Sequence, residues 1–504
     1  MSLLGIDVGT TGCKSGLFSQ DGRLLASVYE EYDFSRPEPG WAQLDSVTVW
    51  EQVKRTIRVV AANASTDPIQ ALSVSSLGES MVPVTQDRQI LGPSILNFDV
   101  RGEEYLPGLS HIIENERLYS INGNTLGNHY GLTKLKWIQQ HQPELYEHTW
   151  KFLLWGSFIP FMLGAEPAVD YSLANRTLLF DIDRCNWSDE LLKLTGLDRT
   201  KLPDVVPAGT VIGQVSVQMA HELGLPANVA IVAGGHDQCL NAVGCGVIQP
   251  GRAMYGMGTY LCAVPVFTQR HEPAAMMRLG LNTEHHAAPG QYVNFIYNQG
   301  GSIVKWFRDT FAAIERREAQ QSGRDIYADL IAEMPKGPSS ILALPHWSTT
   351  GPPQFISNSS GVLVGLRFET TRGDILRGLI EGITFYLREC IETLPQVGIE
   401  IADYCAVGGG SKSDVWLQMT ADILDRPFVR PTVSESGILG AAIIAGTGCC
   451  VFPSLEAGVE VMVKLDRTFE PDQRMHKLYV GRFEQYKQLW PLMKDYLPRL
   501  TAES

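Results

Sequence analysis

The stretch IVAGGHDQCLN, residues 231–241, predicts a buried strand that ends in a tight turn and continues as a helix. A run of β-favouring apolar residues precedes two glycines, and His236, Asp237 and Gln238 follow them. Polar side chains at the carboxyl end of a strand lie where open α/β sheets bind ligands. Asp237 is therefore a candidate general base for a substrate hydroxyl, with capping of the following helix as the alternative.

The composition is that of a large soluble protein with an acidic surface. The chain has 504 residues, of which 44% are hydrophobic and 19% are charged, and its formal net charge is −14. This length predicts two or more domains, and the acidic balance argues against nucleic acid or an anionic membrane as a partner. The N-terminus lacks a signal-peptide pattern, and residues 437–452 are too short and glycine-rich to span a bilayer. Nine scattered cysteines without a CxxC pair indicate reduced thiols and a cytoplasmic location.

Residues 5–14 read GIDVGTTGCK and predict a strand, a glycine turn and a returning strand. The glycines let backbone N–H groups approach an anion, Thr10 and Thr11 carry hydroxyls that can donate to it, and Lys14 is close by. Asp7, just before the turn, is placed to hold Mg²⁺ directly or through water. An ordinary glycine hairpin is the alternative.

A second glycine turn repeats this pattern about half a chain later. GMGT at residues 256–259 resembles DVGT at residues 7–10, and it again lies between two expected strands. Such a repeat predicts two similar α/β domains that face each other, with a nucleotide between Gly258-Thr259 and the first turn. Chance recurrence of a four-residue pattern is the alternative.

Three further stretches are rich in small residues. The glycine pair at residues 300–301 precedes a helix whose first N–H groups, including that of Gly301, can face phosphate; more simply, the glycines start the helix. Gly409 and Gly410 follow an apolar strand and leave room for the flat ring of adenosine, although neither a Walker A nor a GxGxxG motif occurs. Residues 436–446 predict a small-residue helix suited to close packing.

Charged residues also occur at the ends of two apolar runs in the first half. Glu79 lies in GESM at residues 78–81, and Asp99 and Arg101 end the run ILNFDVR at residues 95–101. Carboxylates and an arginine in such places can bind sugar hydroxyls. For Asp99 and Arg101, the spacing equally permits a structural ion pair, which it favours slightly.

Taken together, these stretches resemble the FGGY family of carbohydrate kinases in the actin/Hsp70-like ATPase superfamily. The similar segments follow the family order and span nearly the whole chain, at residues 5–14, 40–43, 234–238, 256–260, 361–381, 408–424 and 434–446. The resemblance implies an α/β fold with two ribonuclease H-like domains, each a mixed sheet flanked by helices, with a cleft between them. We assign residues 1–245 to a domain with the sugar side and the first phosphate turn. Residues 246–504 form the other, with the second turn and the adenosine site; the last helix, expected near residues 483–496, is a candidate to pack back on the first domain.

The resemblance also implies transfer of the ATP γ-phosphate to a hydroxyl of a ketose or a related sugar or polyol. Asp237 then becomes the general base and Asp7 the Mg²⁺ partner. The residues around the β- and γ-phosphates become Thr10, Thr11, Lys14, Gly258 and Thr259, and Gly409 and Gly410 line the adenosine pocket. A nucleotide-gated ATPase of the actin/Hsp70 kind and a sugar sensor without turnover are the alternatives. A homodimer is left open.

The departures from the family concern the sugar side. Met81 stands where xylulokinases have the histidine of a Gln-Met-His segment, and His236 stands where many relatives have glycine. Where xylulokinases have a Trp-Asn-Asp-x-Arg segment, this chain keeps the aspartate and the arginine as Asp99 and Arg101. The two positions before them are Asn97 and Phe98 instead of Trp and Asn. We therefore expect a substrate other than plain D-xylulose. The residues expected to form the sugar site are Glu79, Asp99, Arg101, His236 and Gln238.

Overall fold

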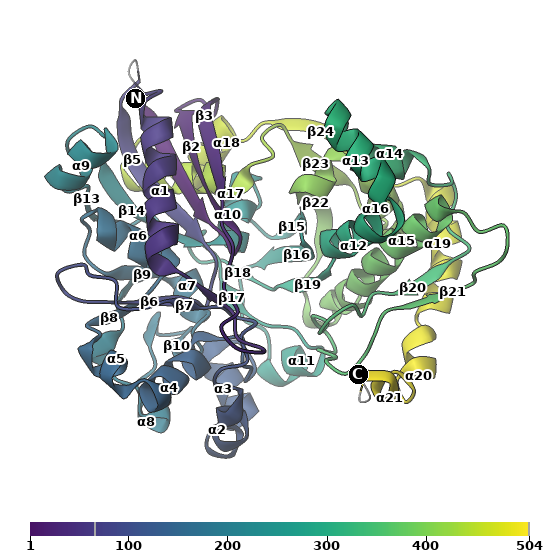
Figure 1. Cartoon of the computed structure of the whole chain (residues 1–504), viewed down its shortest axis with the longest axis horizontal. Coiled ribbons are helices and arrows are strands. Elements are labelled where there is room, and N and C mark those ends of the chain that lie inside the picture. Colours follow the sequence, from purple (N-terminus) through teal and green to yellow (C-terminus); the bar gives the residue numbers. More distant parts are fainter. Residues whose placement is uncertain (65–66, 502–504) are drawn as a thin grey trace.

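Two mixed β-sheets, one from each half of the chain, form the centres of two lobes (Figure 1). This computed structural model describes residues 1–64 and 67–501. The first sheet has six strands in the order β13-β14-β5-β1-β2-β3. Their bounds are β1 Ser2–Val8, β2 Gly12–Ser19, β3 Leu24–Glu31, β5 Ile69–Ser76, β13 Val211–Gln214 and β14 Ala230–His236.

The pairing of these strands brings polar side chains from distant parts of the chain to one edge of the sheet. β1 and β2 form the expected antiparallel hairpin, in which Asp7 lies opposite Lys14. β1 pairs in parallel with β5, and β5 with β14, so that Ser75 is in register with Asp7 and the next residue with His236. Because the carboxyl ends of parallel strands meet at the same edge, the first turn and the segment after β14 become neighbours.

The second sheet has eight strands and repeats the arrangement of the first. An antiparallel hairpin, β15–β16, is followed across the sheet by β22 and β23, each parallel to its neighbour on the hairpin side. The bounds are β15 Gly251–Met257, β16 Tyr260–Phe267, β17 Glu284–His285, β18 Tyr292–Val293, β19 Ile296–Gln299, β22 Ile401–Val407, β23 Phe428–Pro431 and β24 Leu465–Phe469. The repeated hairpin with two parallel strands confirms the predicted pair of similar α/β folds.

Helices flank the first sheet, and further helices form a segment that is inserted between its strands β5 and β13. α1 (Ser46–Ala61) is the expected amphipathic helix, and its apolar stripe, which includes Val49, Val53 and Ile57, is buried. α6 (Trp155–Leu163) and α9 (Val217–Leu223) also belong to this lobe. The inserted helices, at the lower left of Figure 1, are α2 Leu106–Ile112, α3 Asn115–Asn122, α4 Gly131–His141, α5 Pro143–His148, α7 Tyr171–Asn175 and α8 Asp189–Thr195.

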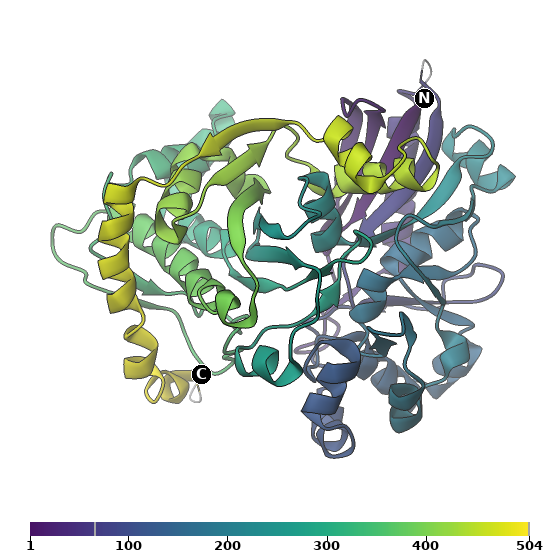
Figure 2. The same ribbon diagram turned by 180° about the vertical axis from the view of Figure 1, so that it is seen from behind.

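The C-terminal helices pack on the second lobe, which corrects the expectation that the last helix returns to the first. The expected helix begins earlier, as α19 (Gln473–Tyr486), and is interrupted before α20 (Leu489–Met493) and α21 (Leu497–Thr501). Tyr479 and Phe483 are buried against the core of the second lobe, and the ring of Phe483 lies 5.6 Å from that of Phe385. Figure 2 draws the C-terminal helices, in yellow, on this lobe. The other helices here are α11 Pro273–Arg278, α12 Gly301–Phe311, α13 Ala313–Ser322, α14 Ile326–Ala332, α15 Arg372–Ile391 and α16 Asp414–Leu424.

The segment that does return to the first lobe is α17 (Ser436–Gly448) with α18 (Leu455–Met462), which Figures 1 and 2 both draw beside the N-terminal strands. α17 crosses α10 (Asp237–Gly244) at very short range. A Cβ atom on Gly440 would lie 1.9 Å from the carbonyl oxygen of Leu240, and one on Gly5 would lie 1.8 Å from that of Ile438. The small residues are therefore needed for this packing, as the sequence indicated.

Candidate active site

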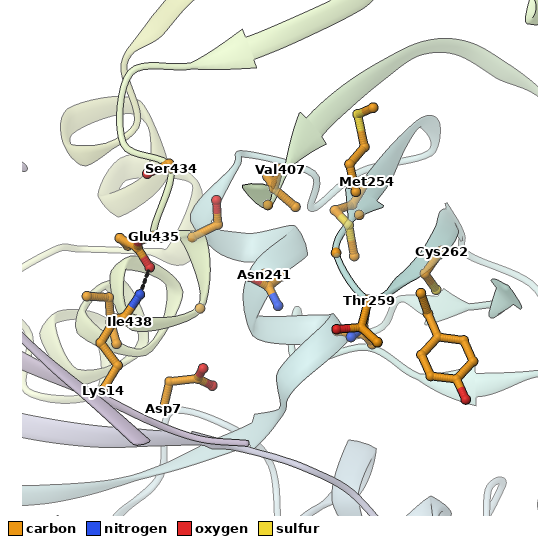
Figure 3. A pocket seen from close by; sticks show the side chains of 18 residues that line it. Asp7, Lys14, Asn241, Met254, Thr259, Cys262, Val407, Ser434, Glu435 and Ile438 are labelled. Atoms are coloured by element: carbon orange, nitrogen blue, oxygen red, sulfur yellow. Dashed lines mark hydrogen bonds and ion pairs between the residues drawn. The ribbon is translucent and has the colours of Figure 1, made fainter. Parts of the chain in front are cut away.

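A cavity of about 340 Å³ lies between the two hairpins (Figure 3). β1 and β2 line it from the first sheet, and β15 and β16 from the second. The start of α10 and the segment that leads into α17 complete it. The polar and glycine residues of this lining include Asp7, Lys14, Gln238, Asn241, Gly258, Thr259, Gly408 and Glu435. The cavity has the position in which the sequence predicted a nucleotide.

Asp7 and Lys14 provide the charges at the first hairpin. The hydroxyl of Ser75, at the end of β5, donates a hydrogen bond to Asp7 Oδ1 at 2.5 Å. Burial raises the pKa of Asp7, while Ser75 and Lys14 act in the opposite direction. Thr10 and Thr11 form the turn beside this pair but are not among the residues that line the cavity. A carboxylate beside an ammonium group is suited to a phosphate and its divalent cation.

Lys14 already has a partner from the other end of the sequence. Its Nζ donates to Oε2 of Glu435, the residue that precedes α17 by one position, and Figure 3 marks the contact. The two residues are 421 positions apart, which is why sequence patterns gave no sign of this pair. A phosphate that enters the cavity therefore competes with Glu435 for the same ammonium group.

The second turn is supported by the start of α12, and this corrects the expectation for Gly301. Gly258 and Thr259 line the cavity, whereas the N–H of Gly301 donates to the carbonyl oxygen of Gly258 at 2.9 Å. The N–H of Ser302 donates to Thr259 in the same way at 3.1 Å. These N–H groups are thus used within the protein. A Cβ on Gly301 would lie 2.4 Å from the Gly258 oxygen, so the glycine allows the helix to approach the turn.

The glycine stretch after β22 reaches the cavity through Gly408, which has a φ of +88°. Gly409 and Gly410 begin the short 3₁₀ helix η4 (Gly409–Lys412) directly beyond it and do not line the cavity. Gly410 packs against Met257, while no atom lies within 4 Å of the Cβ position of Gly409. The open side of Gly409 leaves space next to the cavity, and contact of the two glycines with adenosine stays a prediction.

Asp237 is the first residue of α10, directly after β14. His236 is the N-cap of this helix and no side chain caps it, so the structure does not give Asp237 the capping role that the sequence left open. The Asp237 side chain is 26% exposed. Burial, followed by the charges of Asp7 and Glu79, raises its pKa to about 7. A carboxylate with this pKa is half protonated near neutral pH, which is the range in which a general base is effective.

Gln238 and Asn241 extend α10 along the cavity, three residues apart and on the same face of the helix. Gln238 thereby lies in the cavity with Asp7 and Lys14, rather than only on the sugar side as expected. Asn241 was missed by the sequence analysis. Two amides at this spacing in an otherwise apolar helix were the available signal.

On the sugar side, Glu79 belongs to a buried cluster that sequence reasoning found only in part. Oε1 of Glu79 accepts a hydrogen bond from Arg176 Nε at 2.7 Å, and the same guanidinium pairs with Glu284. Burial raises the pKa of Glu79, and Arg176 opposes this. Glu79 also has a φ of 62°, a conformation that a non-glycine residue holds only when its surroundings impose it. An arginine inside the apolar stretch of residues 173–182 was the signal for Arg176; none was present for Glu284.

Asp99 and Arg101 form the ion pair that their spacing favoured. Arg101 Nε lies 3.0 Å from both carboxylate oxygens of Asp99. The side chain of Arg101 is 3% exposed and that of Asp99 is 0% exposed. Asp99 also accepts from the N–H of Ala42, while the Arg101 guanidinium lies over the ring of Trp41 at 4.2 Å. Both groups are thus satisfied within the protein, and direct contact with a sugar stays a prediction.

The structure also bears on membrane spans, metal clusters and the state of the cysteines. Among residues 1–64 and 67–501, no helix is long and apolar enough to cross a bilayer. In the same residues, no group of three or more histidine, cysteine, aspartate or glutamate side chains is arranged to hold a metal ion. The nine cysteines, all within this part of the chain, are free thiols.

Comparison with known proteins places this geometry in a family. Residues 2–244 match the model for the N-terminal domain of the FGGY family of carbohydrate kinases, and residues 254–449 match the model for its C-terminal domain. The chain is 29% identical to a xylulose kinase of Staphylococcus epidermidis, over 99% of this chain and 98% of that protein. It is 27% identical to an autoinducer-2 kinase of Yersinia enterocolitica, over 95% and 92% of the two chains.

The fold agrees with these matches. The crystal structure of ligand-bound xylulose kinase from Lactobacillus acidophilus superimposes with a TM-score of 0.88, at 22% identity and with 99% of each chain covered. The two hairpins, the cleft and the duplicated sheets are therefore those of a two-domain, actin-like ATPase fold. The chain belongs to the FGGY family of carbohydrate kinases and is an ATP-dependent phosphotransferase that acts on a hydroxyl of a small sugar.

Proposed function

We propose that Asp237 is the general base that accepts the proton of the sugar hydroxyl as it attacks the γ-phosphate of ATP. One observation carries this proposal: Asp237 begins α10 directly before Gln238, which lines the cavity, and burial, followed by the charges of Asp7 and Glu79, raises the pKa of its carboxylate to about 7. A group between the two substrates is positioned for in-line transfer. It also has the proton affinity that general-base catalysis needs at neutral pH.

For the nucleotide, the proposal is that the phosphates of ATP lie between the two hairpin turns. Thr10, Thr11, Lys14, Gly258 and Thr259 surround the β- and γ-phosphates. Lys14 exchanges Glu435 for phosphate when ATP binds, because one ammonium group then faces two competing anions. The adenosine end lies toward Gly408, Gly409 and Gly410. The lining of the cavity by Asp7 and Lys14 of the first hairpin and by Gly258 and Thr259 of the second supports this orientation.

Asp7 is the residue that we propose holds Mg²⁺. Mg²⁺ is usually held by one or two carboxylates together with substrate phosphates, so the single acidic side chain of the first hairpin fits such an ion. Bound there, the ion would neutralise developing charge on the phosphate oxygens. The hydrogen bond from Ser75 keeps the Asp7 carboxylate turned toward this side of the cavity.

The acceptor is proposed to be a ketose or a related sugar or polyol. Glu79 and Gln238 are the polar groups that stay available to it, since Oε2 of Glu79 takes no part in the bonds that Oε1 makes to Arg176. Asp99 and Arg101 support the site from behind. The chain resembles xylulose kinases and an autoinducer-2 kinase to nearly the same extent, and its departures at residues 78–81 favour a sugar other than D-xylulose.

We also propose that residues 1–245 and 246–504 are the two domains, with α17 and α18 of the second packed on the first, and that they close over the substrates. Closure would keep water from the γ-phosphate. ATP is made inside the cell, so we propose a cytoplasmic location, which the free thiols support.

The test is an ADP-release assay with Mg-ATP against a panel of pentuloses, hexuloses, aldoses and polyols, with a control that lacks sugar. We expect ADP release to depend on one or a few of these sugars. Asp237→Asn should lower kcat by about 10²–10⁴-fold, the range for loss of a general base, with the Kd for ATP nearly unchanged. Near-normal turnover of Asp237→Asn would contradict the base assignment. ADP release that is independent of every sugar would favour a nucleotide-gated ATPase.

A further inference from the structure

The imidazole of His236 is enclosed directly beside the proposed base. Its Nε2 lies 3.4 Å from Asp237 Oδ1, and the side chain is 9% exposed. The ring of Phe295 is 5.2 Å away, and a Cβ on Gly78 would lie 3.0 Å from His236 Cδ2. The ring therefore has no space to turn away from Asp237 on these sides, and the glycine at residue 78 provides the space that it occupies.

The backbone of His236 is held as firmly as its ring. The N–H of His236 donates to Ser172 Oγ at 2.9 Å, and this hydroxyl donates to Asp170 Oδ2 at 2.6 Å. Asp170 in turn caps α7 by accepting from the backbone N–H groups of Ser172 and Leu173. This chain of hydrogen bonds fixes the end of β14 and so the point from which Asp237 projects.

The protonation of His236 determines what it offers to Asp237. Burial, followed by the charge of Arg176, lowers the pKa of His236 well below its ordinary value, so the ring is neutral and carries one N–H. Nδ1 is buried and has no partner among the described residues. A proton on Nδ1 would leave a buried donor unsatisfied and would turn the Nε2 lone pair toward a carboxylate oxygen. A proton on Nε2 instead lies on the ring nitrogen that is 3.4 Å from Asp237 Oδ1, which favours this tautomer.

We propose that His236 is a positioning residue, whose Nε2–H donates to Asp237 Oδ1 and holds the carboxylate with Oδ2 toward the sugar hydroxyl. The proposal rests on the proposed role of Asp237 as the base. The separation of 3.4 Å shortens when substrates bind, because catalytic hydrogen bonds are often long in unliganded sites and tighten in the complex. His236 thus acts through Asp237, whereas the sequence analysis placed it among the residues that bind the sugar.

Three substitutions separate this role from packing and from sugar binding. His236→Gln keeps an N–H donor at a similar reach, His236→Leu keeps most of the volume without a donor, and His236→Gly removes both. We expect kcat to fall by about tenfold to a hundredfold in the leucine and glycine variants, as for a misplaced reacting group. The glutamine variant should stay within about threefold of wild type, and the KM for sugar and for ATP should change little in all three. Thermal unfolding, measured on each variant, should report a loss of stability mainly for glycine.

Each contrary result has a separate meaning. A leucine variant with wild-type kcat would overturn the proposal, and so would a rise in sugar KM at constant kcat, which would make His236 a sugar ligand. A glutamine variant as slow as leucine, with both as thermally stable as wild type, would also overturn it. Asp237→Asn, assayed in parallel, separates failure of this inference from failure of the proposed base. If Asp237→Asn retains turnover, the base assignment itself is wrong. If it loses turnover while the His236 variants behave like wild type, only the inference about His236 is wrong.

Discussion

The two hairpins of this kinase have the same backbone arrangement and different chemistry. The comparison is clearest at the second pair of residues back from each turn. In the first hairpin this pair is Asp7 opposite Lys14, and in the second it is Gly256 opposite Cys262. In each sheet, the first strand of the hairpin pairs in parallel with a further strand: β1 pairs with β5, and β15 pairs with β22. The cavity therefore has charged groups on one side and mostly backbone, thiol and thioether groups on the other.

This difference shows that the repeat supplies geometry while the charges are specific to one copy. Backbone N–H groups and glycine turns can surround phosphates from both sides, because they need no particular side chain. The carboxylate and the ammonium group occur on the first hairpin alone among the cavity residues that β1, β2, β15 and β16 provide. We therefore expect the substitution of Asp7 on the first hairpin to affect the chemical step, and substitutions that disturb the second hairpin to affect nucleotide affinity.

Among substitutions that separate the two hairpins, the largest effect is expected for Asp7→Asn. Loss of a preorganised charge at a phosphoryl-transfer site lowers kcat by about 10²–10³-fold, and raising the Mg²⁺ concentration should recover only part of it. The measurement is kcat as a function of Mg²⁺ concentration at saturating sugar. An unchanged Mg²⁺ dependence would remove the metal role from Asp7.

Two further variants control for this result. Asp403→Asn removes a carboxylate that pairs with Arg252, outside the cavity, and should leave kcat unchanged. Moving the acid to the equivalent site, with Asp7→Gly and Gly256→Asp together, should not restore activity, since the backbone geometry is repeated but Ser75 and Lys14 are not. Recovery in this double variant would mean that a carboxylate on either hairpin suffices.

A smaller effect is expected for the pair of Lys14 and Glu435. Substitution of Lys14 should weaken the use of ATP, whereas substitution of Glu435 should strengthen the binding of ATP. Lys14→Met would remove the proposed charge-assisted bond to phosphate. Such a bond contributes about 1.5–3 kcal/mol, so kcat/KM for ATP should fall by about tenfold to a hundredfold. Glu435→Gln leaves Lys14 without its competing anion and should lower the KM for ATP. Steady-state kinetics with varied ATP tests both, and an equal rise of KM in the two variants would contradict the competition.

The smallest effect is expected at the support of the second turn. Gly301→Ala forces a Cβ toward the Gly258 oxygen, to a position 2.4 Å away, so the turn must shift. Overpacking of this kind costs about 1–3 kcal/mol of stability, and the KM for ATP should rise severalfold at nearly constant kcat. Gly481→Ala, in α19 with nothing within 4 Å, is the matched control and should raise Tm slightly. A kcat loss at Gly301→Ala as large as that of Asp7→Asn would remove the distinction between the hairpins.

Local patterns were sufficient for the parts of the site that follow strands directly. Alternating apolar residues with a glycine turn identified both hairpins, and the polar residues after β14 identified Asp237. The small-residue run at residues 436–446 predicted the close helix packing that α17 makes. These features depend on neighbours within a few positions, which is the range that periodicity and turn chemistry report.

Other features required contacts between distant segments. Glu79, Arg176 and Glu284 come from three separate parts of the chain, and nothing in the spacing of one indicates the others. Gly301 followed the expected pattern for a phosphate-binding helix start, but the second turn uses its N–H. The last helix, expected to return to the first lobe, instead packs on the second because its aromatic residues fit the core there.

Strand patterns and turn residues were enough to predict the repeated hairpins with their glycine turns and to place Asp237 at the end of a strand, because these are local properties of the chain. The resemblance to the family then implied the role of Asp237 as the base. Which charges meet became evident from the folded protein. It paired Lys14 with Glu435 and Arg176 with two glutamates, and it placed the His236 ring against Asp237. The physical reason is that the energy of a buried charge depends on every group that surrounds it after folding, and these groups come from distant positions in the chain.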